Sequence, residues 1–298
     1  MAPVAAETFT LPHWSEGTYH HGLLQIALDH APGAHQLRFA RAPETTQARY
    51  ARIMATGNAD YDTLALAYSP QRDDRLKAVP IPLIRGMLGY RRLLIRADRE
   101  SLTHGADGKE IPARDLVLGS APTWPDTQIL KAGGFRLFTA TYDKLFDLVR
   151  RGRVDALPRS VTEVAMELAI ANRQPGKARI RVADDLILAY RSPLFFYVRA
   201  DDTARQRIIT KGLKAAYLSG AFMRHFNADP GVQDTLDLIA RGQARVVWLD
   251  NPLLSASVRA IPDKYWQAPP CVPPQCTPMP AMGGGHGIIP HNRARWDQ

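Results

Sequence analysis

Helix and strand patterns alternate along most of the chain, and this alternation limits the possible folds more than any other feature. Apolar residues recur at helical spacing in 19–30, 141–151, 160–171 and 203–218, while runs typical of buried strands lie at 60–68, 88–96, 154–157 and 195–199. The alternation predicts an α/β protein with mainly parallel sheets flanked by helices. The pattern occurs twice without a residue-level repeat, which argues against a solenoid.

Residues 267–298 differ in composition from everything before them. They hold seven prolines, three consecutive glycines at 283–285 and both cysteines of the chain, Cys271 and Cys276. Such a segment buries too little apolar surface to offset the entropy lost on ordering it. We therefore expect a disordered tail after a compact unit that ends near 266. The two cysteines are close enough for a local bridge, but they supply no disulfide framework.

Charge and hydropathy exclude several classes of protein. The chain has 38 Lys and Arg against 29 Asp and Glu, a formal net charge of +9. The basic residues are scattered singly or in pairs, so we expect no nucleic-acid partner. No run approaches ~18 apolar residues, so we expect no membrane insertion. The small residues at 2–6 are either the end of a removed secretion signal or a plain flexible start.

Signatures of metal and cofactor sites are missing from the sequence. Histidines crowd the first 35 residues without the spacing of a zinc motif, so we predict no metal site. The glycine-rich stretch at 283–287 follows no predicted strand, so we also predict no phosphate-binding loop and no cofactor.

Seven short motifs follow one another in an order that resembles a known family. They are Ser-Pro-Gln-Arg at 69–72, Val-Pro-Ile-Pro-Leu at 79–83, an arginine-bearing strand at 90–96, Val-Leu-Gly-Ser at 117–120, a helix ending in Gly-Arg-Val-Asp-Ala at 145–156, a strand at 195–202 and a helix at 212–222. Together they resemble a divergent branch of bacterial periplasmic solute-binding proteins of the amino-acid-binding type (extracellular solute-binding protein family 3). The likeness covers about residues 15–250.

The resemblance implies a two-lobed, type II periplasmic-binding fold with the ligand between the lobes. Lobe one would comprise residues 1–97 and 192–266, and lobe two residues 98–191. Arg91 matches the arginine that holds the ligand carboxylate in this family. A guanidinium suits that role because its planar fork donates two charge-assisted hydrogen bonds to a carboxylate. The alternative for Arg91 is a solvated arginine at a strand end.

Further candidates surround the expected cleft. Ser120, Thr123 and Trp124 lie between a strand and a helix, where free N–H groups attract anions. The alternative is that they serve as a helix cap and a packing ring. Tyr68 and Ser69 stand where the family's ligand-facing strand ends. Trp14 walls the cleft from lobe one or packs in the core, as does the neighbouring Tyr19.

One departure from the family pattern bears on the ligand. Ser160 stands where typical members carry the aspartate that holds the ligand ammonium, and Arg159 beside it adds positive charge. An ammonium without a counter-ion is costly to bury, so an anionic ligand is favoured over a plain α-amino acid. Glu163 either supplies the missing acid, pairs with Arg159 or closes a capping box with Ser160.

These features together predict a substrate-binding protein for a small polar or anionic solute, amino-acid-like or a carboxylate. The resemblance implies a monomer in the periplasm that serves a membrane permease of the ABC type or a sensor. Two alternatives remain open at this point. One is a dehydratase-like enzyme with Glu163 as its general acid, and the other is an interaction module whose cleft binds nothing.

Overall fold

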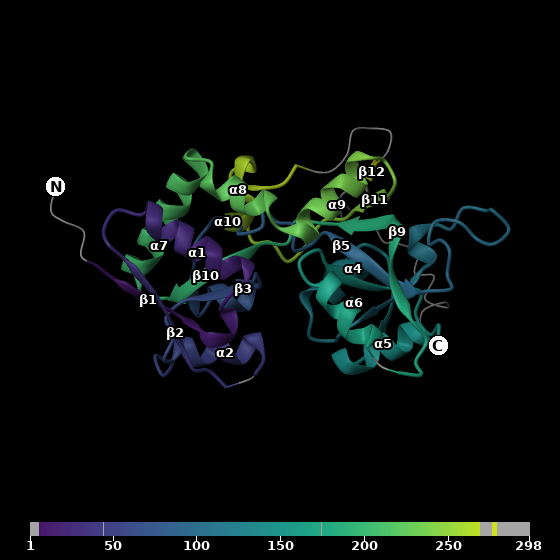
Figure 1. The fold of residues 1–298 in the computed structure, drawn as a ribbon, viewed down its shortest axis with the longest axis horizontal. Coiled ribbons are helices and arrows are strands. Elements are labelled where there is room, and N and C mark those ends of the chain that lie inside the picture. The colour runs from purple at the N-terminus through teal and green to yellow at the C-terminus, as the bar shows by residue number, and fades with distance from the viewer. Residues whose placement is uncertain (1–5, 44, 174, 269–275, 279–298) are drawn as a thin grey trace, which may run out of the picture.

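The computed structural model describes residues 6–43, 45–173, 175–268 and 276–278. Figure 1 shows two lobes side by side, each with helices packed against strands. The elements of the first part of the chain are β1 (Thr8–Pro12), α1 (Tyr19–His30), β2 (Gln36–Ala40), α2 (Gln47–Ala55), β3 (Leu64–Ala67), α3 (Pro70–Asp73), β4 (Leu76–Ala78), β5 (Arg91–Arg96), β6 (Val117–Ser120), α4 (Pro125–Ala132), β7 (Arg136–Thr139) and α5 (Tyr142–Arg150). Those of the second part are β8 (Leu157–Ser160), α6 (Val164–Asn172), β9 (Ile180–Ala189), β10 (Leu194–Arg199), α7 (Thr203–Leu218), α8 (Ala221–Asn227), α9 (Pro230–Ala240), β11 (Arg245–Trp248), α10 (Ala256–Arg259) and β12 (Cys276–Pro278).

Strand β10 is the centre of lobe one. It pairs antiparallel with β3 on one side and with β4 on the other, while β1 and β2 form a parallel pair. The N–H groups of Asp62 and Thr63, just before β3, donate to the Thr10 carbonyl and so join β1 to this sheet. Helices α1 and α7 pack so closely that a Cβ on Gly212 would lie 1.8 Å from the carbonyl oxygen of Ala27.

Lobe two is built around β5, which lies between β8 and β9 and runs antiparallel to both. Strand β9 pairs in parallel with β11, and β6 pairs in parallel with β7. Leu93 and Leu94 of β5 are both fully buried but belong to two different apolar clusters. Because successive side chains point to opposite faces of a strand, this sheet is covered on both faces. The predicted two-lobed α/β architecture is confirmed.

The chain passes between the lobes at 79–90 and at 190–193, and these two crossings lie against each other. The Tyr190 N–H donates to the Gly89 carbonyl, and the Ser192 N–H donates to the Gly86 carbonyl, both at 3.2 Å. A Cβ on Gly89 would lie 2.1 Å from the Tyr190 carbonyl oxygen, so only glycine allows this approach. Strands β5 and β10 each follow one crossing, and each pairs antiparallel with both of its neighbours, whereas the pairs β1–β2, β6–β7 and β9–β11 are parallel.

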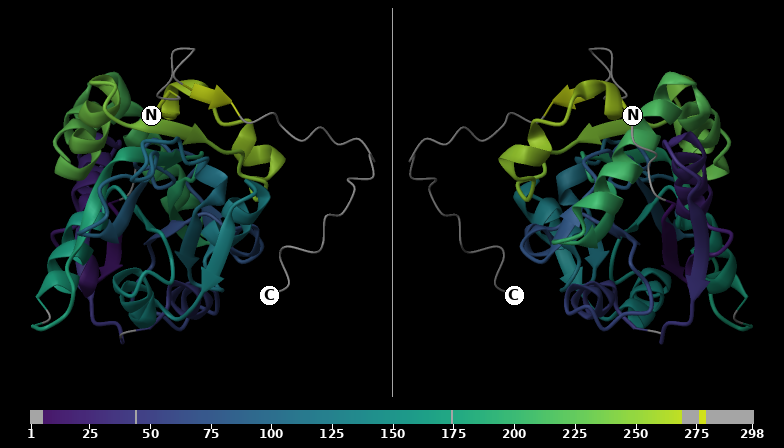
Figure 2. Two further views of the ribbon diagram at one scale, coloured as in Figure 1. Left: turned by 90° about the vertical axis from the view of Figure 1, so that its right-hand side faces the viewer. Right: turned by 90° about the vertical axis from the view of Figure 1, so that its left-hand side faces the viewer.

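Residues 261–268 pack along the two crossings. Arg85, with φ of +52°, donates from Nη1 to the Lys264 carbonyl at 2.8 Å and from Nη2 to the Trp266 carbonyl at 2.6 Å. The Tyr90 hydroxyl donates to the Ala268 carbonyl at 3.1 Å. Figure 2 shows this segment, in yellow, along the top of the molecule in both views. Residues 264–268 are therefore fastened to the two crossings.

The strand pairing differs from the predicted lobe boundaries in two places. Strands β5 and β11 both pair with β9, so they belong to the sheet of lobe two, although the sequence placed them in lobe one. The sequence predicted disorder throughout 267–298. Strand β12 (Cys276–Pro278) pairs in parallel with β11, so that prediction is wrong for these three residues. Residues 269–275, including Cys271, and 279–298 lie outside the described residues. No helix in the described ranges is long and apolar enough to cross a membrane.

Candidate ligand-binding cleft

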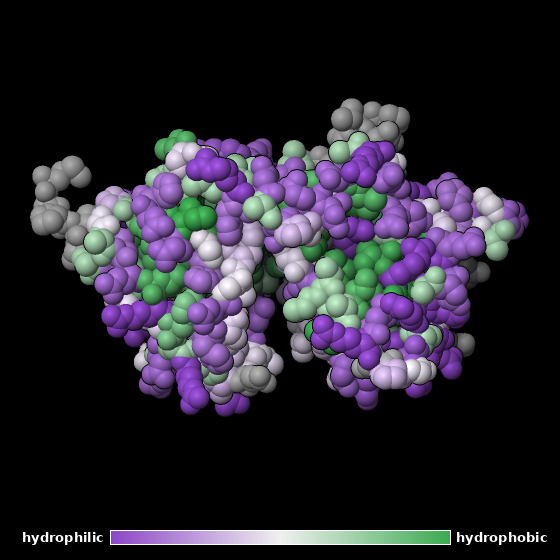
Figure 3. Space-filling model, in the orientation of Figure 1, coloured by the Kyte–Doolittle hydropathy of each residue, from purple (hydrophilic) through white to green (hydrophobic). Residues whose placement is uncertain are grey.

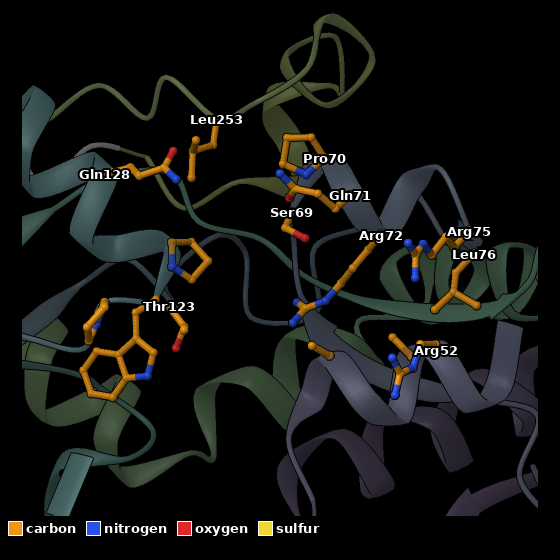
Figure 4. Close-up of a pocket in the computed structure, with 15 residues that line it drawn as sticks. Arg52, Ser69, Pro70, Gln71, Arg72, Arg75, Leu76, Thr123, Gln128 and Leu253 are labelled. Atoms are coloured by element: carbon orange, nitrogen blue, oxygen red, sulfur yellow. The ribbon is translucent and has the colours of Figure 1, made fainter. Parts of the chain in front are cut away.

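A cleft of about 460 Å³ lies between the two lobes. Lobe one lines it with one face of α2 and with segment 69–76 after β3, and lobe two lines it with 122–128 at the start of α4. Figure 3 shows the lobes parted along the lower side of the molecule, and Figure 4 shows residues of both walls facing each other. The volume falls within the range of roughly 300–1,000 Å³ that is usual for small-molecule sites.

Arg72 is the charged side chain that reaches farthest into this space (Figure 4). It lies on the short helix α3, which begins after Ser69 with proline at its first position. Its Nη2 donates to Gln47 Oε1 at 3.2 Å, whereas its Nη1 is buried and has no hydrogen-bond partner among the described residues. Burial lowers the pKa of the Arg72 guanidinium. A buried, unpaired donor of this kind is unfavourable until an acceptor fills its place.

The rest of the lining is polar and basic, with short apolar patches. Arg52 of α2 and Arg75 after α3 add two exposed guanidinium groups, and Gln71 and Gln128 add amides. The lining includes no Asp or Glu; its full membership is Ala48, Ala51, Arg52, Ser69, Pro70, Gln71, Arg72, Arg75, Leu76, Pro122, Thr123, Trp124, Pro125, Gln128 and Leu253. The described cleft wall therefore favours anions.

Three of the ten residues predicted from the sequence line this cleft: Ser69, Thr123 and Trp124. Ser69 lies on the wall of lobe one, and Thr123 and Trp124 lie on the opposite wall. The structure therefore brings residues more than 50 positions apart to two sides of one space.

Arg91, the predicted carboxylate contact, is not in the lining. It is 5% exposed, and its guanidinium is satisfied inside lobe two. Its Nη2 donates to Asp126 Oδ1, its Nε donates to the Tyr190 hydroxyl at 2.8 Å, and that hydroxyl donates to the same Asp126 oxygen. Burial opposes the charge of Arg91, but Asp126 and Tyr190 hold the pKa of the guanidinium above its usual value. Asp126 thus occupies the place that a ligand carboxylate would take.

Arg159 is neutralised in the same way. Its Nε donates to Glu167 Oε2 at 2.5 Å, and its Nη2 donates to Glu163 Oε2 at 3.0 Å and to Glu167 Oε1 at 2.7 Å. Its Cζ lies 4.5 Å from the ring centre of Trp124 and 5.7 Å from that of Tyr142. Arg159 therefore supports the ring of Trp124 from behind the cleft, and Glu163 is used as a counter-ion.

The remaining predicted residues lie outside the lining as well. Buried Ser120 shares a hydrogen bond with Thr127 at 2.8 Å, and buried Ser160 lies 3.3 Å from the Thr162 hydroxyl. The Tyr68 hydroxyl is buried and accepts the Ser255 N–H at 3.3 Å. The side chain of Trp14 packs on Tyr50 with ring centres 5.2 Å apart, as the packing alternative predicted. Helices α4 and α6 have no side-chain cap among the described residues, so the helix cap at Ser120 and the capping box of Ser160 and Glu163 are not formed.

The sequence did contain a signal for Arg72. Arg72 ends the Ser-Pro-Gln-Arg motif at 69–72, one of the seven motifs of the resemblance, but the carboxylate contact was predicted at Arg91 on the strand at 90–96. Arg52, Arg75 and Gln128 carry no sequence signal, because only the folding of α2 and α4 brings them to one space. Among the described residues, no group of three His, Cys, Asp or Glu side chains could hold a metal ion.

No family model matches the chain, and no curated protein matches it. Solved structures do resemble it. The probable amino-acid ABC transporter extracellular-binding protein of Bacillus subtilis is 12% identical with a TM-score of 0.51, and covers 76% of this chain and 96% of its own. The periplasmic His/Glu/Gln/Arg/opine family-binding protein of Silicibacter pomeroyi, in complex with lysine, is 12% identical with a TM-score of 0.50. This match covers 76% of the present chain and 97% of that protein. These likenesses show the two-lobed fold of type II periplasmic binding proteins.

Proposed function

We propose that the protein is a binding protein that captures a small anionic solute in the inter-lobe cleft, with Arg72 as the anchor for a carboxylate or similar group. The single observation that carries the proposal is the buried Nη1 of Arg72, a residue of the cleft lining, which has no hydrogen-bond partner among the described residues. Every ordered buried donor needs an acceptor, and a ligand oxygen would supply one.

The hinge gives the cleft a means of closing on the solute. The two crossings lie side by side at one edge of the lobes, so a small rotation there moves the wall of Thr123 and Trp124 toward Arg72. Ser69 and Thr123 would contribute hydroxyl groups from the two sides. Capture by hinge closure is the mode in which solute-binding proteins of this shape trap small ligands.

The compartment and the partner belong to the same proposal. The similar solved proteins are described as a periplasmic binding protein and as an extracellular-binding protein of a transporter. We infer a periplasmic monomer that delivers its solute to an ABC-type permease or a sensor. A dehydratase-like enzyme has less support, because its only candidate acid, Glu163, is paired with Arg159 and does not line the cleft.

Thermal unfolding in the presence of small carboxylates, amino acids and phosphate tests this function. A ligand that binds only the folded state at 100 times its Kd stabilises it by about 2.7 kcal/mol. We expect stabilisation by at least one carboxylate, and its loss in Arg72→Gln. The matched control is Arg49→Gln, an exposed arginine on α2 outside the lining, which should keep the ligand effect. Equal stabilisation of both variants would contradict a ligand at Arg72.

A further inference from the structure

The described lining of the cleft carries three guanidinium groups and no carboxylate to balance them. Arg52, Arg72 and Arg75 all line it, and none of the three forms an ion pair with a described residue. This differs from the buried arginines nearby, since Arg91 and Arg159 each hold at least one carboxylate. Unpaired arginines gathered on one wall create a local positive potential that a small anion would neutralise.

The described acids that neighbour the lining in the chain or contact its residues are engaged elsewhere or lie outside it. Asp126 holds Arg91 and Tyr190, and Glu163 and Glu167 hold Arg159. Asp73 follows Arg72 in α3, but it lies outside the lining and accepts a hydrogen bond from Tyr68, while burial raises the pKa of its carboxyl group. An ammonium group entering the cleft would therefore meet guanidinium groups and no free carboxylate of the lining.

We propose that the solute carries two anionic groups and no ammonium, with one group on Arg72 and the second on Arg52 and Arg75. The proposal rests on the proposed function and specifies the class of solute for the same site. Arg72 is the buried contact, and the two exposed arginines of the lining are available to bind the second anionic group of the solute. A dicarboxylate and a carboxylate that bears a phosphate ester share this chemistry, because a guanidinium fork fits both groups.

The walls between the charged groups suit a short apolar spacer. Leu76 and Leu253 line the cleft together with Trp124, whose ring is held in place by Arg159. A solute with a few methylene groups between its two anionic ends would contact these side chains. Because the second group is read by exposed arginines, salt should weaken its contribution more than that of the group on Arg72.

Calorimetric titration with three matched compounds tests this inference. Glutarate carries two carboxylates, butyrate carries one on the same carbon spacing, and glutamate adds an ammonium to glutarate. We expect glutarate to bind at least 10-fold more tightly than either of the others. A fourth titration with 3-phosphoglycerate, which carries one carboxylate and one phosphate, distinguishes a phosphate ester from a second carboxylate as the preferred group.

A cleft variant and a control variant show whether Arg75 binds the second anionic group of the solute. Arg75→Gln should lower the affinity for glutarate at least 10-fold, toward that for butyrate, and leave butyrate unchanged, whereas Arg49→Gln should change neither. Glutamate or lysine binding as tightly as glutarate, with dependence on Arg72, would overturn the two-anion class but leave the proposed function intact. Glutarate binding that Arg75→Gln and Arg52→Gln do not alter would also overturn it. The failure of every compound to bind would contradict the proposed function itself.

Discussion

The buried pair of Arg91 and Asp126 makes the most specific prediction about stability. Asp126→Asn removes one negative charge but keeps the size of the side chain. In the wild type, the Arg91 side chain is 6% exposed and that of Asp126 is 20% exposed. Both Arg91 and the Tyr190 hydroxyl donate to the same Asp126 oxygen. The substitution therefore leaves a guanidinium buried without a counter-ion.

Removing one partner of a buried ion pair costs about 3–5 kcal/mol, because the remaining charge is uncompensated. An asparagine oxygen still accepts one hydrogen bond, and Asp126 is partly exposed, so we expect the lower end, about 3 kcal/mol. At roughly 2–4 °C per kcal/mol for a chain of this size, the midpoint of thermal unfolding should fall by about 6–12 °C.

Urea unfolding followed by circular dichroism measures this loss directly. The control is Asp250→Asn, which removes a charge from an exposed pair with Arg259 and should cost about 0–1 kcal/mol. Arg91→Met combined with Asp126→Asn should recover part of the loss, because it removes the uncompensated charge. A loss below about 1 kcal/mol in Asp126→Asn would refute the view that Arg91 is held by an internal carboxylate.

Three further predictions follow from other contacts. Burial lowers the pKa of His20 to about 4, so the unfolded chain binds more protons than the folded chain between pH 4 and 6.5. The free energy of unfolding should therefore fall by about 1–3 kcal/mol as the pH drops through this window. In urea unfolding, His20→Gln should flatten this pH dependence, whereas the exposed His104→Gln should leave it unchanged. Gly212→Ala should lower the unfolding midpoint strongly, because its Cβ would lie 1.8 Å from the Ala27 carbonyl oxygen, and an unchanged midpoint would contradict the close packing of α1 on α7. Arg85→Ala should cost about 2–4 kcal/mol by removing two charged hydrogen bonds to the C-terminal segment, with wild-type stability as the contrary result.

Local sequence patterns predicted elements closely where neighbouring residues define them, and poorly where contacts with distant residues define them. Helix α7 has the predicted bounds 203–218, because the signals that define it are local; the Asp202 side chain caps its start by accepting the Arg205 N–H at 3.0 Å. The strand predicted at 154–157 is instead β8 at Leu157–Ser160, and the helix predicted from 160 begins at Val164. A buried strand that contains Arg159 becomes reasonable only once Glu167 and Trp124 surround the charge.

The same limit applies to the site. Arg91 looked available because its partners lie 35 and 99 positions away along the chain, where no local pattern reveals them. Arg72 lay within a motif that carried the family resemblance, but its burial and lack of a partner become visible only in the fold. The predicted anionic ligand does not depend on either choice, because the described lining of the cleft is also basic and includes no Asp or Glu.

A crystal structure of the complex with the tightest-binding compound tests the central claim most directly. We predict ligand density between Arg72 and Thr123, with an anionic group about 2.7–2.9 Å from the guanidinium nitrogens of Arg72. The lobes should lie closer together than in Figure 3, and Asp126 should stay on Arg91. Ligand density on Arg91 with Asp126 displaced, or density outside the inter-lobe cleft, would contradict the account.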